Sequence, residues 1–265
     1  MKTTRILAAA LSLSLLPFIV KAPARADGAA PVVPDPTPAS PVQGYKLTWS
    51  DEFNGTALDT TKWDYRTDTK GWSVQQPANV SVANGLLVLA LKKEDVGGHH
   101  HTGGGVISKA IFKYGYFESR FKIPVAHGWH TSFWMMKYNG ADTKGDVSNE
   151  EVDVCENNSS NPLNYAPNLH RWLPDHVQFG PVQVKTPDLS ADFHVWGCEI
   201  TPTVVNMFFD GKPVASFPDN KIDMSDENIW LTSIALPHPG NHDTLDDTKL
   251  PDVAEFDYVR FFSKQ

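Results

Sequence analysis

Cysteine and positive charge are both scarce in this chain, and the two shortages exclude several classes of protein. Two cysteines in 265 residues cannot build a disulfide-dense scaffold or a zinc site with four cysteine ligands. The 23 basic residues are outnumbered by 31 acidic ones, which gives a formal net charge of −8. Because phosphate binding needs a positive surface, nucleic acid is not an expected partner.

Long apolar runs are also missing, apart from one at the start of the chain. Residues 6–20 are apolar, but these 15 residues are short for a bilayer span, which takes about 20. Basic residues precede the run and an Ala-Arg-Ala sequence ends at Ala26, which predicts a signal peptide over residues 1–26, with a retained anchor as the alternative. Cleavage removes four basic and no acidic residues. We therefore expect a secreted protein, extracellular or periplasmic, with a net charge of −12 and no membrane span.

Residues 27–44 contain five prolines and no periodic apolar pattern. Such a composition predicts an extended, semi-rigid linker. The folded domain is then expected to span residues 45–265, a length that suits one β-sandwich. We find no internal repeat and expect a monomer.

Helical periodicity is nearly absent from the folded part, where apolar and polar residues alternate instead. Asp210-Gly211 is a two-residue turn signal between two alternating segments, which predicts a hairpin. The strands that we predict most firmly are at residues 86–91, 114–123, 128–136, 204–209, 212–217 and 255–262. Many short strands at this spacing predict an all-β fold, an antiparallel β-sandwich of two packed sheets.

Three acidic residues lie in one strand-like segment near residue 150. On a strand, Glu151 and Asp153 share one face, whereas Glu156 would turn into the core, where an unpaired acid is costly. A β-bulge around Val154 and Cys155 would return Glu156 to the face of the other two. Like charges this close cannot all ionise at ordinary pKa values, so one carboxyl is expected to hold a proton near neutral pH.

Two glutamates that flank a shorter aspartate can bring their carboxyl groups to about 5 Å, the separation of a retaining glycosidase. We therefore interpret Glu151, Asp153 and Glu156 as catalytic residues. A solvated acidic strand face and a calcium cluster are the alternatives.

The segment from Glu151 to Glu156 resembles the signature of glycoside hydrolase family 16, Glu-(Ile/Val)-Asp-(aliphatic)-x-Glu, in the variant with one extra residue. Nearly the whole folded part shares the resemblance. The other segments that resemble the family, in the right order, are residues 49–55, 104–122, 196–212 and 256–260.

This resemblance implies a concanavalin-like jelly roll with a polysaccharide cleft on its concave sheet, and a secreted, retaining endo-β-glycanase that requires no cofactor. It implies that Glu151 attacks the anomeric carbon and that Glu156 protonates the leaving oxygen and later activates water. Asp153 would hydrogen-bond and polarise the nucleophile.

Four residues near the acids are expected to bind the substrate, because sugar C–H faces stack on indole rings and sugar hydroxyls need fixed polar partners. Trp129 and Trp134 lie where the family places subsite tryptophans. His170 and Trp172 follow the catalytic strand, and the resemblance implies that His170 hydrogen-bonds the acid or the sugar. The sandwich core is the alternative for the three tryptophans. The tryptophans that we expect in the core are Trp49, Trp63, Trp196 and Trp230.

The favoured substrate is a β-1,3-glucan of the laminarin type. Laminarin-cleaving members commonly have a Trp-Pro pair where this chain reads Gly-Trp-His-Thr-Ser-Phe-Trp-Met-Met over residues 128–136, and residues 132–135 resemble the agar-cleaving branch about as well. The run of glycines at residues 103–105 also lacks an arginine that many glucanases carry there. A β-galactan of the agar or porphyran type is therefore the alternative, although the negative net charge disfavours a heavily sulfated polymer.

Two further functions use the same scaffold. A transglycosylase would share the covalent intermediate but pass the sugar to another chain. A lectin-like sugar-binding sandwich is the non-enzymatic alternative, since fold does not fix function, and the three intact acids speak against it.

Metal and disulfide sites have weaker signals. The resemblance implies a structural calcium ion on the convex face, with Glu52 and Asp257 as its positions. Residues 99–101 are three histidines in a Gly-rich segment, a pattern more typical of an exposed turn than of a metal site. Cys155 and Cys198 both lie on predicted strands, where a disulfide and two free buried thiols are equally compatible with the sequence.

Overall fold

The computed structural model describes residues 38–138, 150–219, 227–236 and 245–265. The predicted signal peptide and most of the predicted linker lie outside these residues. The chain divides into two compact units, residues 1–36 and 37–265, and the fold is that of the second unit. Its first strand begins at Tyr45, where the sequence predicts the folded domain to begin. Within the described ranges no helix is long and apolar enough to cross a bilayer.

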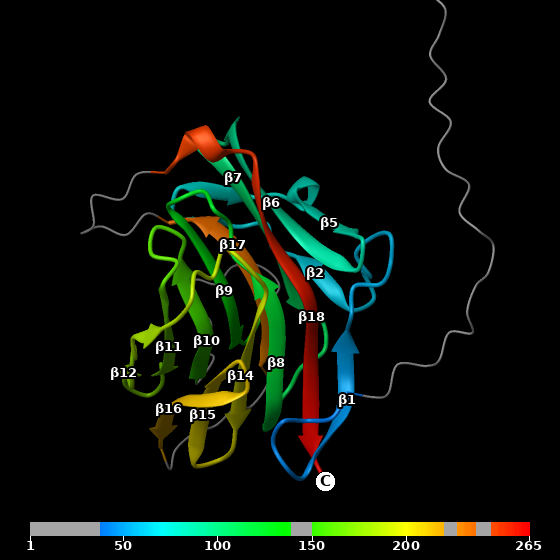
Figure 1. Cartoon of the computed structure of the whole chain (residues 1–265), viewed down its shortest axis with the longest axis vertical. Coiled ribbons are helices and arrows are strands. Elements are labelled where there is room, and N and C mark those ends of the chain that lie inside the picture. The colour runs from blue at the N-terminus through cyan, green and yellow to red at the C-terminus, as the bar shows by residue number, and fades with distance from the viewer. Residues whose placement is uncertain (1–37, 139–149, 220–226, 237–244) are drawn as a thin grey trace, which may run out of the picture. The chain divides into compact units, whose positions relative to one another are not determined.

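One layer of the fold is an antiparallel sheet that we call the back sheet (Figure 1). Its strands are β1 (Tyr45–Asp51), β5 (Val80–Ala83), β6 (Leu86–Val96), β8 (Gly115–Lys122), β14 (His194–Ile200), β15 (Val204–Phe209), β16 (Lys212–Pro218) and β18 (Asp252–Lys264). The long strand β18 is central. On one side it pairs with β8, followed by β14, β15 and β16; on the other side β6 and β1 pair with its two halves, and β5 pairs with β6.

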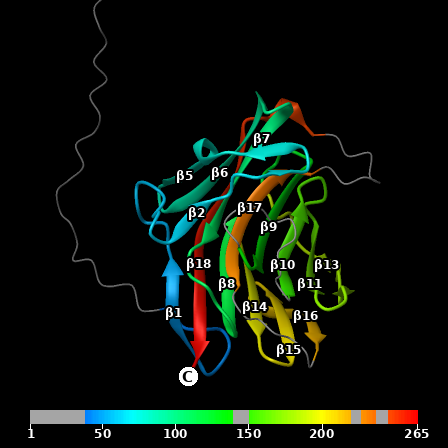
Figure 2. The ribbon, with the colours of Figure 1, turned by 180° about the vertical axis from the view of Figure 1, so that it is seen from behind.

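The second layer, the front sheet, is also antiparallel. In spatial order its strands are β2 (Trp63–Tyr65), β7 (His99–Ser108), β17 (Asn228–Ala235), β9 (Trp129–Met136), β10 (Glu150–Asn158), β11 (Asn164–Arg171) and β12 (Val177–Gln178). Figure 2 shows β7, β17, β9 and β10 side by side. Pairing of β6 with β7 joins the two sheets at one end.

Short elements complete the described part of the fold. They are β3 (Thr69–Lys70), β4 (Ser73–Gln75), β13 (Val184–Lys185), and the 3₁₀ turns η1 (Pro77–Asn79) and η2 (Asp247–Lys249). Strand β4 pairs with β3 and runs parallel to β7, and β13 pairs with β11. The hairpin of β3 and β4 and the segment that carries β12 and β13 therefore lie at opposite edges of the front sheet.

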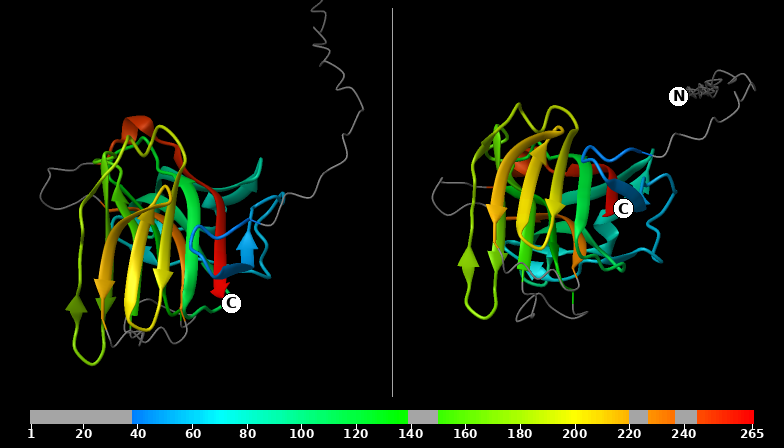
Figure 3. Two further views of the ribbon diagram at one scale, coloured as in Figure 1. Left: turned by 60° about the horizontal axis from the view of Figure 1, so that its bottom comes forward. Right: turned by 90° about the horizontal axis from the view of Figure 1, so that it is seen from below.

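The hydrophobic core lies between the two sheets, which are seen one behind the other in Figure 3. Alternate residues on each strand are apolar, so each sheet turns one apolar face inward. Phe121 on β8 is fully buried and stacks on Trp196 at 3.8 Å and on Phe256 at 4.7 Å between ring centroids. The predicted all-β sandwich is confirmed.

The tryptophans expected in the core are largely buried. Trp63 and Trp196 are fully buried in the main core, and Trp49 packs partly buried against it. Trp230 is buried too, but in a separate cluster with Trp134.

Two local predictions about turns had opposite outcomes. The hairpin at Asp210-Gly211 is confirmed, and both residues have the positive φ values, 47° and 73°, that this type of tight turn requires. The expectation that residues 99–101 form an exposed turn is wrong, because they begin β7. A two-residue turn at Gly97-Gly98 closes a long hairpin in which the charged end of β6 pairs with β7.

We predict that the stacked aromatic group in the core is a main source of stability. Phe121→Ala should lower the free energy of unfolding by about 3–5 kcal/mol, because it removes a fully buried ring and leaves a cavity. Urea unfolding measures this change. Ile111→Ala is the control, since that side chain is 60% exposed and its loss should cost less than about 0.5 kcal/mol. Equal losses in both variants would contradict the packing described above.

Candidate active site

A β-bulge in β10 determines the direction of the acidic side chains. Along β9, Asp153 pairs with Trp134 and the next pair joins Cys155 to Phe133, so Val154 is the extra residue. Val154 and Cys155 are both buried in the core, one after the other. After this interruption the strand resumes its alternation with all three acids on the face away from the core. The predicted bulge is confirmed.

Two neighbouring cavities lie on the outer face of the front sheet and share His130, Glu156 and Leu236. The acid cavity, about 320 Å³, is also lined by Glu151 and Asp153. The amide cavity, about 510 Å³, contains Glu156 but neither of the other two acids. The structure therefore brings the three predicted catalytic residues together at one end of a longer hollow.

Glu151 receives a hydrogen bond from an indole. Trp172 Nε1 donates to Glu151 Oε2 at 2.9 Å. Burial raises the pKa of Glu151, as does the charge of Glu156, while the Trp172 hydrogen bond and the charge of Lys70 partly oppose this rise. The indole thus stabilises the ionised carboxylate, which is the form that a nucleophile needs.

Asp153 is the most enclosed of the acids, with 3% of its surface exposed. Burial raises its pKa well above the ordinary value, and the charges of Glu156 and Glu151 raise it further. Asp153 is therefore the carboxyl of the three that most readily keeps a proton, and it shares a hydrogen bond with Glu151. The direction of this shift agrees with the expectation that one of three crowded carboxyls holds a proton more strongly than the others.

Glu156 has a different environment. His130 Nε2 lies 3.2 Å from Glu156 Oε1, and His130 lines both cavities. Burial alone would raise the pKa of Glu156, but the hydrogen bond and charge of His130, with a contribution from His170, lower it below the ordinary value. In the free protein the pKa values of Asp153 and Glu156 are therefore shifted in opposite directions, which favours a proton on Asp153 over one on Glu156.

Three aromatic side chains stack on one another close to Glu151 and Asp153. Trp172 stacks on His176 at 4.1 Å and on His170 at 5.2 Å between ring centroids. His170 Nδ1 is 2.9 Å from His176 Nε2, and His170 Nε2 is 3.6 Å from Asp153 Oδ2. Burial and the neighbouring His176 lower the pKa of His170. His170 and Trp172 are thus beside the acids, as predicted.

The tryptophans predicted as a sugar platform separate into two groups. Trp134 is 9% exposed and lines the acid cavity, where it stacks on Trp230 at 4.7 Å. Trp129 is fully buried, in a cluster with Leu91 and Ala235, so it presents no face to a sugar. The prediction for Trp129 is wrong because the start of β9 faces inward at the junction of β6 and β17.

An arginine lies near the glycine run, although the sequence of the run has none. Arg66 packs over Gly105, where a Cβ would meet the Arg66 side chain at 3.2 Å. Its guanidinium lies 6.0 Å from the ring of Trp134 and 5.6 Å from that of Trp230, and it pairs with Asp68. Arg66 also lines the acid cavity. A neighbouring strand thus supplies a cation next to the glycine run.

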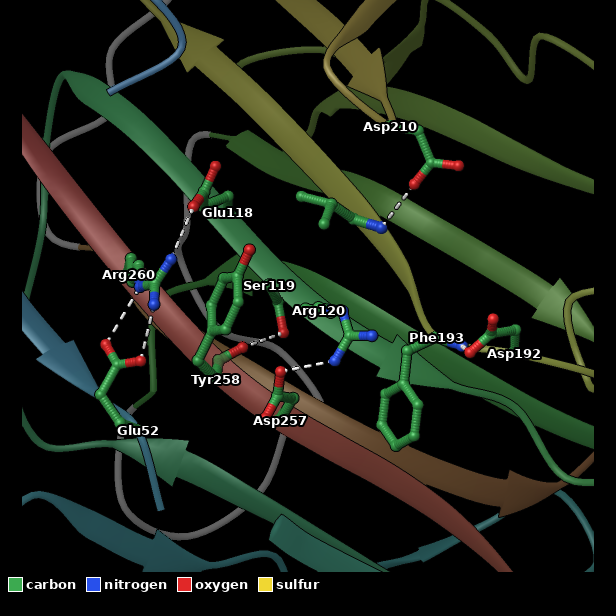
Figure 4. A network of polar contacts seen from close by, with 11 residues as sticks. Glu52, Glu118, Ser119, Arg120, Asp192, Phe193, Asp210, Asp257, Tyr258 and Arg260 are labelled. Carbon is green, nitrogen blue, oxygen red and sulfur yellow. Dashed lines mark hydrogen bonds and ion pairs between the residues drawn. The ribbon is translucent and has the colours of Figure 1, made fainter. Parts of the chain in front are cut away.

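The two residues predicted to bind calcium form ion pairs with arginines. Figure 4 shows Arg260 between Glu52 and Glu118, and Arg120 beside Asp257. Because these guanidiniums neutralise both carboxylates, Glu52 and Asp257 do not fit a calcium site. Among the described residues no group of three or more His, Cys, Asp or Glu side chains could hold a metal ion. A structural calcium ion stays a prediction that these contacts do not favour.

Two of the three consecutive histidines pair with aspartates, and both cysteines are buried. His100 pairs with Asp95, and His101 pairs with Asp247 of η2 at 2.7 Å. Cys155 and Cys198 are free and buried in the core, so the structure has the free-thiol alternative.

Comparisons with known proteins agree with this site. A model of the family described as "Beta-porphyranase A-D, GH16 domain" matches residues 46–263. A beta-glucanase from Rhodothermus marinus is 28% identical over 246 residues, which cover 82% of this chain and 85% of that protein. Beta-porphyranase D from Zobellia galactanivorans is 33% identical over 181 residues, or 56% of this chain and 42% of that protein.

Among solved structures, SCLam, a non-specific endo-beta-1,3(4)-glucanase from family GH16, is similar with a TM-score of 0.72 and 25% identity. The match covers 86% of this chain and 94% of that chain. A jelly roll with this cluster of acids in an open hollow defines the protein as a glycoside hydrolase. The chain belongs to glycoside hydrolase family 16 and is an endo-acting glycanase, which confirms the resemblance found in the sequence.

Sequence reasoning missed two residues of the site. His130 contacts Glu156, and His176 contacts His170 and Trp172. His130 carried a signal, because it lies in residues 128–136, the segment that lacks the Trp-Pro pair of laminarin-cleaving members. His176 lies between β11 and β12, in a segment without strand periodicity, and no sequence pattern marks it.

We predict that the Trp172 hydrogen bond supports ionisation of Glu151. Trp172→Phe removes the donor, so the pKa of Glu151 rises further and the acidic limb of the kcat/KM profile against pH moves to higher pH. At the optimum, kcat/KM should fall about tenfold or more, since hydrogen bonds to charged groups contribute roughly 1.5–3 kcal/mol. An unchanged acidic limb with unchanged Tm would show that the indole does not act on Glu151.

We predict that His130 sets the basic limb of the kcat/KM profile against pH. His130→Gln removes the contact that lowers the pKa of Glu156, so the pKa of Glu156 rises and its proton is kept to higher pH. The basic limb of the kcat/KM profile should therefore move to higher pH. His100→Gln is the control, because that exposed histidine pairs with Asp95 and is not among the described residues that line either cavity. A basic limb that stays in place would contradict the role of His130.

Proposed function

We propose that this chain is a secreted, monomeric, retaining endo-β-glycanase that cleaves a β-linked polysaccharide by double displacement. The observation that supports this most is the arrangement of the three acids. The pKa of Asp153 is raised and its carboxyl is hydrogen-bonded to Glu151, and Glu156 stands on the same face beyond the bulge. Two carboxyl groups that differ in environment can act as nucleophile and as acid.

In the first step, a carboxylate oxygen of Glu151 attacks the anomeric carbon while Glu156 transfers a proton to the glycosidic oxygen. The C–O bond to the leaving chain breaks and a glycosyl ester on Glu151 forms. In the second step, ionised Glu156 removes a proton from water, which attacks the anomeric carbon and releases Glu151. Asp153 and Trp172 keep their hydrogen bonds to the nucleophile, and no cofactor takes part.

Release of the proton by Glu156 in the first step is made easier by His130. A Glu156 carboxylate remains after the first step, and the His130 contact stabilises that carboxylate before water attacks. The same contact opposes protonation in the free protein. A bound sugar that excludes water from the acid cavity would restore the proton, because desolvation raises the pKa of a carboxyl.

The first candidate substrate is a β-1,3-glucan, as the sequence predicts, and the glucanase relatives support it. A second candidate, a β-galactan of the agar or porphyran type, is favoured by two observations. The family model that matches the chain is of the porphyranase type, and residues 128–136 lack the Trp-Pro pair that laminarin-cleaving members commonly have. Lys70, which lines the acid cavity and interacts electrostatically with Glu151, would suit a polymer with occasional negative groups.

We predict that Glu151→Gln abolishes hydrolysis and leaves folding intact. A digest of laminarin, mixed-linkage glucan, agarose, porphyran and carrageenan with the unmodified protein should release reducing sugars from at least one polymer. Removal of a covalent nucleophile should reduce that rate by roughly 10⁴-fold or more. Glu255→Gln is the control, since Glu255 pairs with Lys122 on the back sheet and should leave the rate within about twofold.

The products decide between the alternatives. Nuclear magnetic resonance of the first product formed should show the retained β-anomer, and inversion would contradict the double displacement. Products longer than the donor would indicate a transglycosylase. The unmodified protein and Glu151→Gln could both bind sugar and release almost no reducing sugar. That result would indicate a lectin and refute the hydrolase.

A further inference from the structure

The amide cavity extends the site on one side only. It begins at Glu156 and continues over β11 and the segment that carries β12 and β13. Neither Glu151 nor Asp153 lines the amide cavity. Both acids line the acid cavity, together with Trp134 and Trp172. The amide side chains that line the cavity are those of Asn158, Asn161, Asn164, Asn168, Gln178 and Gln183.

These amides fall into two kinds. Asn158 donates to the Leu236 carbonyl at 2.8 Å, and Asn168 contacts His170 at 2.8 Å, so both are engaged in holding the wall. In the described part of the chain, the side-chain amides of Asn164, Gln178 and Gln183 make no hydrogen bond. Each free amide offers two N–H donors and a carbonyl acceptor to a ligand.

The segment that carries the two glutamines is held firmly against β11. Gly180 N donates to Asn168 Oδ1 at 3.0 Å, and Phe179 N and Val182 N donate to carbonyl groups of β11. A Cβ at Gly180 would meet Asn168 Oδ1 at 2.7 Å, so only glycine allows this close approach. Fixed backbone contacts keep the glutamines at the edge of the cavity before any ligand binds, which lowers the entropy cost of binding.

The chemistry of the lining selects a neutral, hydroxyl-rich ligand. Among the described residues that line the amide cavity there is no lysine or arginine, and its one large aromatic side chain, Tyr165, is buried. An anionic group would find no cation beyond the histidines, whereas amides pair well with hydroxyl groups. The lining of this cavity thus differs from that of the acid cavity, which has indoles, Arg66 and Lys70.

We propose that the amide cavity binds the neutral sugar units on the leaving-group side of the cleaved bond, through Gln178 and Gln183 with Asn164. This inference rests on the proposed function. Glu156 protonates the leaving oxygen, and Glu151 attacks from the acid cavity, so the sugar attached to the leaving oxygen lies on the side of Glu156 that is away from Glu151. The amide cavity occupies that side. The acid cavity then holds the sugar that becomes bound to Glu151.

The test compares a long and a short leaving group in the full chain. The probes are laminarihexaose and 4-nitrophenyl β-laminaribioside, or the corresponding hexasaccharide and nitrophenyl bioside of a galactan if only that polymer is cleaved. The variant is the double substitution Gln178→Ala with Gln183→Ala. Asn54→Ala is the control, an exposed amide between β1 and β2 that lies outside both cavities.

For the hexasaccharide, kcat/KM of the double variant should fall about tenfold, the effect of losing two neutral hydrogen bonds. For the nitrophenyl substrate it should stay within about twofold, because the small leaving group does not reach the amides. Asn54→Ala should change neither value.

Equal losses on both substrates, or no loss on the hexasaccharide, would overturn the inference while leaving the proposed function in place. Failure of the unmodified protein to cleave either probe and every polymer of the panel would overturn the proposed function, and this inference with it.

Discussion

One extra residue in β10 is the constraint on which the site depends. A regular strand would direct Glu156 toward the core, where its charge would meet only apolar side chains. With Val154 and Cys155 both buried, the strand gives the core two consecutive side chains and returns the next residue to the cleft. The cost of the bulge is a local gap in the hydrogen-bond ladder, which neighbouring strands on both sides of β10 accommodate.

Bringing three carboxyls together creates an electrostatic problem that the surroundings resolve. Burial raises the pKa of Asp153, the most enclosed of the three, so this carboxyl ionises least readily and the repulsion within the cluster is reduced. Trp172 then stabilises Glu151, and His130 stabilises Glu156. Each acid thus has a distinct partner from a different strand or loop, and these partners give chemically similar groups different proton affinities.

The tryptophans have separate roles that follow from the two-layer architecture. Trp63 and Trp196 fill the space between the sheets, while Trp134 and Trp230 form a second, stacked layer on the cleft face beneath Arg66. Beyond Glu156, asparagine and glutamine side chains line the cavity in place of the tryptophans. The cleft therefore changes from aromatic and cationic to neutral and amide-lined across the catalytic acids, and this asymmetry gives the substrate chain a direction.

The sequence by itself determined the fold class, the hairpin at Asp210, and the bulge with its three acids, because alternation with period two and a five-residue spacing are local properties of a strand. It did not determine which tryptophans face a sugar. Trp129 and Trp134 are five residues apart on one strand and so point to opposite faces, but the alternation does not say which face is the cleft. The packing of β6 and β17 around the start of β9 buries Trp129. Nor could it find His176 or the free glutamines, since a contact between residues on separate elements depends on how the sheets pair and where the connecting segments lie. The tertiary structure decided which side chains contact each acid. Those contacts set the proton affinity of each carboxyl group, on which the reaction depends.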